Sequence, residues 1–312
     1  MLADEKQNWE RDEPAARLSI AEITRLLDPW LAGRDVLDAE LLSGGLMNRN
    51  VLLRLSGRPA ECVLRVYDRD PSSCAREVAV LGMIGRDVPV PRVFYADEAG
   101  EHGPPLAVLS AVDGISLFTL RSMGDDEALA AASYAAGRVL PSIGKFPGPP
   151  TPAETVGSLV ERFGGTAVYQ QRVPAALHER LLAVVNAWQP RLEEVSLVHG
   201  LVHCDFNSRN VFVARDGDGW RVSAVLDWEF AIDASPFVDV GNFLRYHRPE
   251  RPCYEPQFSR GLRDGGMLLP DDWLMIARLM DAPALCELLT RPRVPASVVG
   301  ELIDLLERMT DG

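Results

Sequence analysis

The sequence lacks the features that mark membrane, disulfide-rich and nucleic-acid-binding proteins. It contains no stretch of about 18 uninterrupted apolar residues, so no membrane-spanning helix is expected. Its five cysteines are scattered and form no C-x-x-C pair, which predicts free thiols in a reducing cytoplasm. The first residues are acidic and polar, unlike a signal peptide. The net charge of −13 argues against nucleic acid or an anionic membrane as a partner.

The remaining composition is that of an ordinary globular protein. Hydrophobic residues make up 47% of the chain and charged residues 25%. A length of 312 residues is enough for two lobes with their own cores. The acidity permits a cationic substrate without demanding one. Nothing in the sequence indicates an oligomeric state.

The most informative stretch is an H-x-D-x-x-x-x-N pattern formed by His203, Asp205 and Asn210, with Asp227 further along the chain. This spacing matches the catalytic loop and the downstream metal-binding Asp of kinase-like phosphotransferases. A hydroxyl that attacks a γ-phosphate needs a carboxylate to orient it and take its proton, which suits Asp205. Mg²⁺ prefers oxygen ligands, which suits Asn210 and Asp227. We expect His203 to shape the loop.

The chain between these two parts of the pattern predicts a β-hairpin. Apolar runs at 211–214 and 222–226 flank the turn sequence Asp-Gly-Asp-Gly at 216–219. Asn210 and Asp227 stand at the outer ends of the two strands. We therefore expect the hairpin to bring them back beside each other as one magnesium site.

Two other groups near the pattern have competing interpretations. His199 looks like a second start of the pattern, but Leu201 stands where the acid should be, so His199 is expected to pack or line the loop. Cys204 could act as a thiol nucleophile, yet its neighbours suit a kinase better.

These residues, together with Ser-Pro-Phe-Val-Asp-Val-Gly at 235–241, resemble the aminoglycoside phosphotransferase / choline kinase family, the small-molecule branch of the protein-kinase-like fold. The resemblance covers roughly residues 40 to 300 and is most specific at 203–241. The chain differs from protein kinases at Asn207, where Lys is usual, and at 227–229, where Asp-Trp-Glu replaces Asp-Phe-Gly. No Ala-Pro-Glu motif follows.

The resemblance implies an α+β, two-lobed fold. Residues 1–109 would form the nucleotide-binding lobe, a small antiparallel sheet preceded by a helix near 19–31 that opens with a Ser-x-x-Glu capping box. Residues 110–114 would form the hinge, and residues 115–312 a mostly helical lobe for catalysis and substrate binding. The sequence also predicts a helix through 73–84 with Asp70 as its N-cap, a helix from Asp125 to about Ile143, and two separate helical segments near 271–278 and 282–290.

The resemblance also implies that a nucleotide binds between the lobes, held by Ser43, Gly44, Gly45, Arg65, Glu77, Ser110 and Val112. Glycines let backbone N–H groups approach phosphates closely. Arg65 takes the place of the protein-kinase Lys, and Glu77 would orient it. The phosphate-contacting cation could instead be Arg49 or Arg54. The adenine would bond to the Ser110 carbonyl and the Val112 N–H.

The expected activity is ATP-dependent transfer of the γ-phosphate to a hydroxyl of a small molecule, with Mg²⁺ as cofactor. An aminoglycoside-type acceptor is the first interpretation, and a choline- or homoserine-type metabolite kinase is the alternative. A catalytically silent nucleotide-binding module is a third. Glu229, Asp233 and Glu255 are candidate acids of the acceptor pocket.

Overall fold

The computed structural model describes residues 17–42, 48–248 and 254–311. These residues form two compact units. The N-terminal unit runs to Gly114 and also contains Ser223–Phe230, and the C-terminal unit contains Ile115–Val222 and the chain from Ala231 on. The chain therefore returns once to the N-terminal unit before it completes the C-terminal one.

The return segment differs from the expected assignment of residues 115–312 to one lobe. Hydrogen bonds to residues before Gly114 explain its place in the N-terminal unit. The Val225 N–H donates to the Pro89 carbonyl at 2.8 Å, and the Ser223 hydroxyl donates to the Asp113 carbonyl at 2.6 Å. Asp227, which follows directly, is thus placed by the N-terminal unit.

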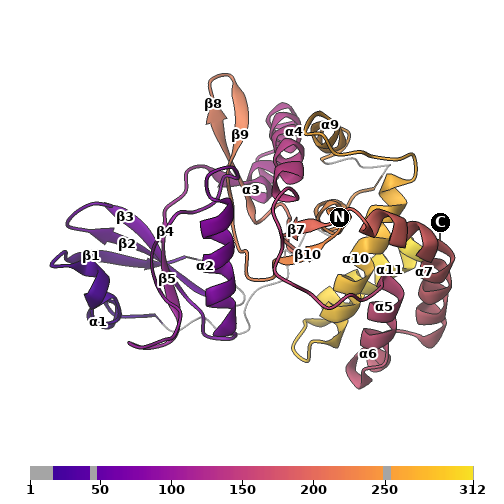
Figure 1. Ribbon diagram of the computed structural model, residues 1–312, viewed down its shortest axis with the longest axis horizontal. Helices are drawn as coiled ribbons and strands as arrows, with labels where there is room; N and C mark the ends of the chain where they lie inside the picture. The colour runs from indigo at the N-terminus through magenta and orange to yellow at the C-terminus, as the bar shows by residue number, and fades with distance from the viewer. Residues whose placement is uncertain (1–16, 43–47, 249–253, 312) are drawn as a thin grey trace. The chain divides into compact units, whose positions relative to one another are not determined.

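The N-terminal unit is built on a small antiparallel sheet, as expected (Figure 1). Its strands follow the order β1-β2-β3-β5-β4, with every neighbouring pair antiparallel. The strands are β1 (Val36–Leu41), β2 (Arg49–Leu55), β3 (Glu61–Val66), β4 (Val93–Asp97) and β5 (Leu106–Ser110).

Helix α1 (Ile20–Leu31) covers one face of this sheet. It begins at the expected capping box, in which the Ser19 hydroxyl accepts the Glu22 N–H and the Glu22 carboxylate accepts the Ser19 N–H. Its buried side chains recur at helical spacing and join the core with alternate residues of β3, among them Leu64 and Val66. Arg65 lies between those two residues in β3, so its side chain points to the opposite face.

Helix α2 (Ser72–Ile84) contributes the buried Glu77. Asp70 was expected to cap this helix, but Pro71 occupies the cap position. Asp70 still satisfies the first turn, because its carboxylate accepts the Ser72 N–H at 3.1 Å and its carbonyl accepts the Ser73 N–H at 3.1 Å.

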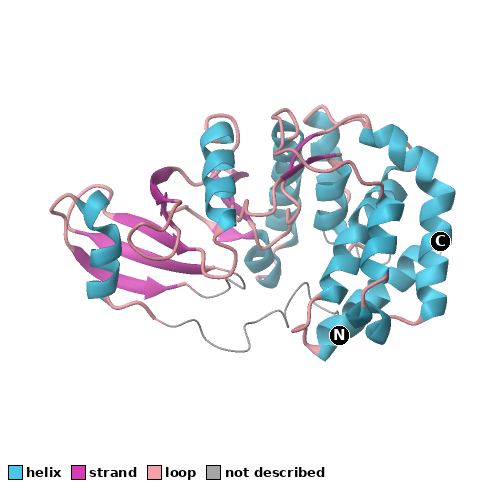
Figure 2. Ribbon diagram, turned by 60° about the horizontal axis from the view of Figure 1, so that its bottom comes forward, coloured by secondary structure: helices cyan, strands magenta, loops and turns pink. Residues whose placement is uncertain are grey.

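The C-terminal unit is mostly helical, as Figure 2 shows. Its helices are α3 (Leu117–Ser122), α4 (Asp126–Ile143), α5 (Val156–Gly164), α6 (Ala167–Arg172), α7 (Ala175–Ser196), α8 (Phe237–Leu244), α9 (Gln257–Asp264), α10 (Trp273–Thr290) and α11 (Ala296–Thr310). Its short strands are β6 (Ile115–Ser116), β7 (Gly200–Val202), β8 (Val211–Asp216), β9 (Gly219–Val225) and β10 (Ile232–Ala234). The last three residues of β9 belong to the N-terminal unit.

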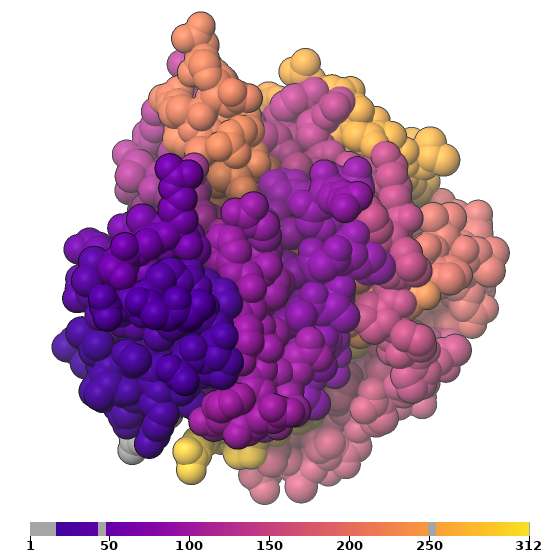
Figure 3. All heavy atoms as spheres, turned by 60° about the vertical axis from the view of Figure 1, so that its left-hand side comes forward, coloured from indigo at the N-terminus to yellow at the C-terminus, as the bar shows by residue number. Residues whose placement is uncertain are grey.

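The expected hairpin is present as β8 and β9. Gly217 adopts φ +57° at the turn, a conformation that glycine reaches without steric cost. The turn is exposed, and the orange tip of the hairpin projects from the surface in Figure 3.

Helix α10 differs from the sequence expectation of two segments, 271–278 and 282–290. It is one helix from Trp273 to Thr290 with Pro283 inside it. Proline removes one helical hydrogen bond, which normally ends or kinks a helix. Here both sides of the proline are buried, including Leu279 and Leu285, so tertiary packing outweighs the lost bond.

Helix α8 packs directly against α10. A Cβ at Gly241 would lie 2.0 Å from the Ala277 carbonyl oxygen, so only glycine allows this approach. The close contact fixes the position of α8, which carries Asp239. No helix among the described residues is long and apolar enough to span a membrane.

Candidate active site

The backbone of the catalytic loop is held by a carboxylate from α8. Asp239 is buried, and its two oxygens accept the N–H groups of His203 at 2.8 Å and Cys204 at 2.9 Å. Cys204 adopts φ 65°, a left-handed conformation that is uncommon for residues other than glycine. The two hydrogen bonds stabilise this conformation and so direct the chain into Asp205.

Asp205 is oriented by two side-chain amides of its own loop. Its Oδ1 accepts a hydrogen bond from Asn207 Nδ2 at 2.8 Å, and its Oδ2 accepts one from Asn210 Nδ2 at 2.8 Å. The same two amides also donate to the Asp205 carbonyl, each at 2.9 Å. Since Nδ2 makes both bonds of Asn210, Oδ1 is the Asn210 atom that can bind a cation.

His203 contacts the backbone of Asp205. The ring is fully buried, its Nδ1 accepts the Asp205 N–H at 3.1 Å, and it meets Phe206 edge-on at 6.3 Å. A buried ring that bonds to backbone is suited to shaping the loop, and this role of His203 stays a prediction.

The two competing groups lie in different surroundings. Burial, together with Asp239 and Asp205, raises the pKa of Cys204 well above its ordinary value, so it is a thiol rather than a thiolate. His199 is exposed and lies 2.8 Å from Asp233 Oδ1. The candidate acceptor acid Asp233 therefore has a partner on the surface.

The titration of Asp239 gives a first testable prediction. Burial raises its pKa to about 7, against the opposing effect of the His203 and Cys204 N–H groups. Between about pH 4 and 7 the folded protein keeps a proton that the unfolded chain has released. This contribution to the free energy of unfolding is therefore full at low pH and falls as pH rises to 7. The Asp239→Asn variant should lack it.

Urea unfolding at pH 5 and pH 7 measures this difference. The wild-type free energy of unfolding should decline relative to that of Asp239→Asn, by up to ~1.4 kcal/mol per pH unit. Asp216→Asn, on the exposed hairpin turn, serves as the matched control. Parallel pH profiles for wild type and Asp239→Asn would rule out a buried titrating Asp239.

The N-terminal unit holds a separate group of predicted site residues, an arginine surrounded by carboxylates. The Arg65 side chain is only 7% exposed, and its Nε lies 2.9 Å from Glu77 Oε2. Arg65 also forms an ion pair with Asp227, and its Nη2 atom lies 3.9 Å from Glu229 Oε1. Burial disfavours the Arg65 charge, but the three carboxylates outweigh it and raise the pKa of Arg65.

Glu77 connects this arginine to the Asp-Trp-Glu segment. Its Oε2 accepts the Tyr67 hydroxyl at 2.6 Å, and its Oε1 accepts the Trp228 N–H at 3.0 Å. The Trp228 indole is fully buried and donates to the Val225 carbonyl at 2.9 Å. These bonds hold Asp227, whose φ of 72° is a conformation that Asp tolerates better than most residues.

Glu229 occupies the interior of this network, not an acceptor pocket at the surface. It is 2% exposed, and its Oε2 accepts Asn48 Nδ2 at 2.9 Å. Arg76 donates to the Glu229 carbonyl at 2.7 Å. Burial and Asp227 raise the pKa of Glu229 to about 7, against the opposing effects of Arg65 and Asn48. Glu255, the third candidate acid, accepts two hydrogen bonds from Ser259.

The alternative phosphate-contacting cations have other surroundings. Arg49 pairs with Asp68, with Nε 2.5 Å from Oδ2. Arg54 is 56% exposed and lies 3.4 Å from both Asp38 and Glu61. Arg65 is thus the buried arginine of the three, and it is the one beside Glu77.

The remaining expected nucleotide contacts are only partly described. Ser43, Gly44 and Gly45 lie outside the described residues. Ser110 ends β5, and its hydroxyl accepts the Arg92 N–H at 3.0 Å. Val112 is half-buried in the segment that follows. The assignment of these residues to nucleotide binding stays a prediction.

The expected metal ligands belong to different units. Asn210 lies in the C-terminal unit and Asp227 in the N-terminal unit, so their pairing at the ends of the hairpin stays a prediction. Their oxygen donors suit a hard cation. Within residues 17–42, 48–248 and 254–311, no group of three or more His, Cys, Asp or Glu side chains could hold a metal.

Sequence reasoning assigned no role to Asp239, Asn242 or Arg245. Asp239 lies in the 235–241 stretch that carried the resemblance, so that pattern could have identified it. Arg245 forms a buried, two-bond ion pair with Asp281, which is 36 residues away. No local pattern signals a partner at that separation.

Comparisons with known proteins identify the family and the fold of the chain. Residues 38–273 match the model of a family described as the phosphotransferase enzyme family. No curated protein matches the chain. The wild-type aminoglycoside 2'-phosphotransferase-IIIa in complex with GDP is similar in structure, with a TM-score of 0.74 at 16% identity over 94% of this chain and 99% of that one. A thermostable variant of APH(4)-Ia in complex with AMP-PNP and hygromycin B has a TM-score of 0.66 at 21% identity, over 93% and 96%.

The family match covers most of the chain, and the solved structures share its fold. The fold is the two-lobed, α+β architecture of kinase-like small-molecule phosphotransferases. The chain belongs to the phosphotransferase enzyme family.

Proposed function

We propose that the protein transfers the γ-phosphate of ATP to a hydroxyl of a small molecule, with Asp205 as the base. The observation that carries this proposal is the Asp205 carboxylate itself. Asn207 and Asn210 each donate to one of its oxygens at 2.8 Å. A carboxylate held by both oxygens has a defined direction from which it accepts the proton of an acceptor hydroxyl.

The phosphates of the nucleotide are assigned to Arg65 and to the glycine-containing segment Ser43-Gly44-Gly45. Arg65 is oriented by Glu77 at 2.9 Å, which supports its role as a fixed positive charge. The adenine is assigned to the Ser110 carbonyl and the Val112 N–H. The similar structures that hold GDP or AMP-PNP support the use of a nucleotide.

Asn210 and Asp227 would hold Mg²⁺ through an amide oxygen and a carboxylate. The bound cation would offset the negative charge that is spread over the transferred phosphate. Asp227 is 30% exposed and pairs with Arg65. Arg65 therefore orients this ligand as well as supplying charge to the phosphates.

An aminoglycoside-type acceptor is the first candidate, because a similar structure contains hygromycin B. Choline- and homoserine-type acceptors are the alternatives. The silent-module hypothesis is disfavoured because Asp205, Asn210 and Asp227 are all present. The free cysteines Cys62, Cys74, Cys204 and Cys286 support a cytoplasmic enzyme.

Two measurements test the proposed function. The melting temperature should rise with ATP and Mg²⁺ together and less with either alone. An ATP-consumption screen over hydroxylated amines, sugars and amino acids should then identify acceptors, with product phosphorylation confirmed by mass spectrometry. Absence of both a thermal shift and ATP consumption would contradict a kinase function.

Removal of the Asp227 carboxylate should abolish the Mg²⁺-dependent part of this thermal shift, because a hard cation loses its charged protein ligand. Asp227→Asn is a better variant than Asp227→Ala, since asparagine tolerates the φ of 72° that alanine does not. Asn210→Ala should reduce the shift less, because only a neutral ligand is lost.

Asp218→Ala on the exposed turn of the hairpin is the control for this series. It should show the full wild-type shift. Equal Mg-ATP shifts in wild type and Asp227→Asn would remove Asp227 from the metal site.

A further inference from the structure

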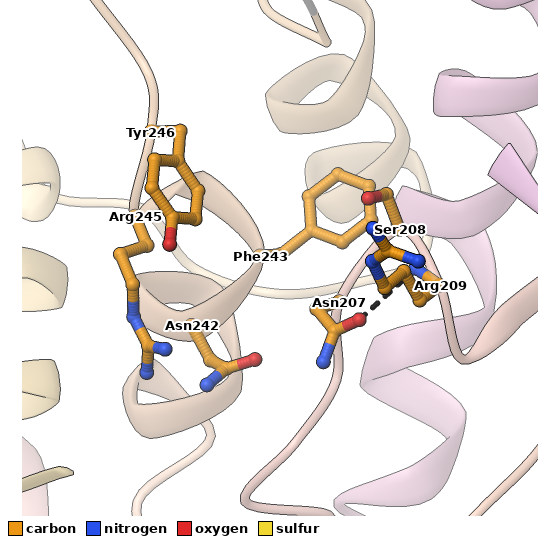
Figure 4. A pocket seen from close by; sticks show the side chains of 7 residues that line it. All are labelled: Asn207, Ser208, Arg209, Asn242, Phe243, Arg245 and Tyr246. Atoms are coloured by element: carbon orange, nitrogen blue, oxygen red, sulfur yellow. Dashed lines mark hydrogen bonds between the residues drawn. The ribbon is translucent and has the colours of Figure 1, made fainter. Parts of the chain in front are cut away.

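Asn242 and Glu229 each carry a buried side-chain oxygen that makes no hydrogen bond to any described residue. Asn242 Oδ1 belongs to a residue that lines the small pocket of Figure 4, which has room for about one water molecule. Glu229 is 2% exposed, and its Oε1 faces the Arg65 guanidinium. The oxygen of Asn242 can therefore be satisfied by solvent, whereas that of Glu229 lies beside a cation of its own unit.

The rest of Glu229 is held in place by three neighbours. Its Oε2 accepts Asn48 Nδ2 at 2.9 Å and the Ser73 hydroxyl at 3.4 Å. Its carbonyl accepts Arg76 Nη1 at 2.7 Å. All four residues belong to the N-terminal unit. The carboxylate is thus fixed through its backbone and through one oxygen, and the other oxygen is presented to Arg65.

One nitrogen of Arg65 stands between two acceptors. Its Nη2 donates to Asp227 Oδ1 and lies 3.9 Å from Glu229 Oε1. A hydrogen bond needs a distance of about 2.7–3.2 Å, so a movement of roughly 1 Å would transfer Nη2 from one carboxylate to the other. The Nε atom lies 2.9 Å from Glu77 Oε2 and can keep that ion pair during the movement.

A cation on Asp227 would change the balance between these two acceptors. Mg²⁺ offsets the charge of the Asp227 carboxylate and repels a guanidinium beside it. The Arg65 side chain is only 7% exposed, so it cannot turn to water when this pairing weakens. A buried charge needs a partner, and a buried carboxylate oxygen needs a donor. Pairing of Nη2 with Glu229 Oε1 satisfies both groups at once.

We propose that Glu229 is a positioning residue for Arg65, and that its Oε1 takes over the Nη2 group when Asp227 binds Mg²⁺. Asp227 is thereby released to the cation, while Arg65 stays charged, buried and paired with Glu77. The inference rests on the proposed function, since that function assigns Mg²⁺ to Asp227. It gives Glu229 a part in metal binding that acts through Arg65 and involves no contact with the acceptor.

Two crystal structures of the full chain with AMP-PNP test the exchange directly, one with Mg²⁺ and one with EDTA in its place. With Mg²⁺ the cation should bind Asp227, and the distance from Arg65 Nη2 to Glu229 Oε1 should fall from 3.9 Å to about 3 Å. With EDTA Nη2 should stay on Asp227. Both are determined at pH 8, because burial raises the pKa of Glu229 to about 7 and the carboxylate must be charged.

Two variants separate this contact from the effect of charge alone. Glu229→Gln removes the charge, and Glu229→Asp keeps it but withdraws the carboxylate from Arg65 by one methylene. Each should raise the Mg²⁺ concentration at half of the Mg²⁺-dependent thermal shift with AMP-PNP by at least ~10-fold, because Arg65 loses its second acceptor. Glu40→Gln, at an exposed position of β1, should match the wild type. The melting temperature without Mg²⁺ shows which variants fold, and the wild-type structures decide the proposal where neither does.

The outcomes separate this inference from the function on which it rests. Mg²⁺ bound to Asp227 with Arg65 Nη2 still on that carboxylate overturns the exchange and leaves the proposed function intact. A Mg²⁺ response of Glu229→Asp equal to that of the wild type also overturns it, because charge alone would then suffice. A short contact between Nη2 and Glu229 in the Mg²⁺ structure, with both variants shifted, supports the exchange. Absence of Mg²⁺ from Asp227 in that structure overturns the proposed metal site and the exchange with it.

Discussion

Asp205→Asn should lower turnover by at least about 100-fold, in line with the usual contribution of a general base. The amide cannot take the proton of the attacking hydroxyl. The new NH2 group must also face either Asn207 Nδ2 or Asn210 Nδ2, so one hydrogen bond is replaced by a contact between two donors. Initial rates at saturating ATP and acceptor measure the effect.

The fold and the nucleotide affinity should survive this substitution. Asp205 is only half-buried, and the backbone before it is held independently by Asp239. The Mg-ATP thermal shift therefore serves as the internal control, and Asp216→Asn serves as the matched exposed variant. Turnover near the wild-type value in a folded Asp205→Asn protein would remove Asp205 from the mechanism.

Arg65→Ala should have the largest effect on stability. The substitution leaves Glu77, Asp227 and Glu229 near one another without their shared cation. Breaking a buried ion pair on one side typically costs about 3–5 kcal/mol. The free energy of unfolding should fall by that order, and in the protein that remains folded the KM for ATP should rise and turnover should fall.

Arg65→Lys should recover part of both properties, because lysine restores the charge without the planar fork that reaches several carboxylates. Arg54→Ala is the matched control on the neighbouring strand. Arg54 is 56% exposed and its ion pairs are 3.4 Å long, so its loss should cost less than about 1 kcal/mol. Arg65→Ala and Arg54→Ala variants of equal stability and equal KM for ATP would contradict the assignment of Arg65.

Much of the loop geometry could be predicted from the sequence because it depends on short separations. Asn207 and Asn210 lie two and five residues from Asp205, and they reach it within one loop. The hairpin turn at Gly217 and the capping box at Ser19 are equally local. Chain geometry at such distances leaves few arrangements, so the residue types are sufficient evidence for them.

Helix boundaries were predictable only where packing agreed with local preference. Asp125 caps α4 as a short polar residue should, and the helix ends at Ile143 as expected. Pro283 misled the prediction for α10. One proline destabilises the helix by less than the burial of the residues on both sides of it stabilises the helix. Tertiary contacts of this kind leave no mark within a window of a few residues.

The sequence by itself determined the pattern at 203–210, the presence of Arg65 and Glu77, and the small antiparallel sheet that holds Arg65. Only the tertiary structure decided that Glu229 is buried with Asn48, 181 residues away, and that Arg245 is neutralised by Asp281. It also decided that Asn242 keeps an unpaired oxygen next to the catalytic loop. Burial and the choice of a partner depend on residues far apart in the chain, and only the folded chain brings them together.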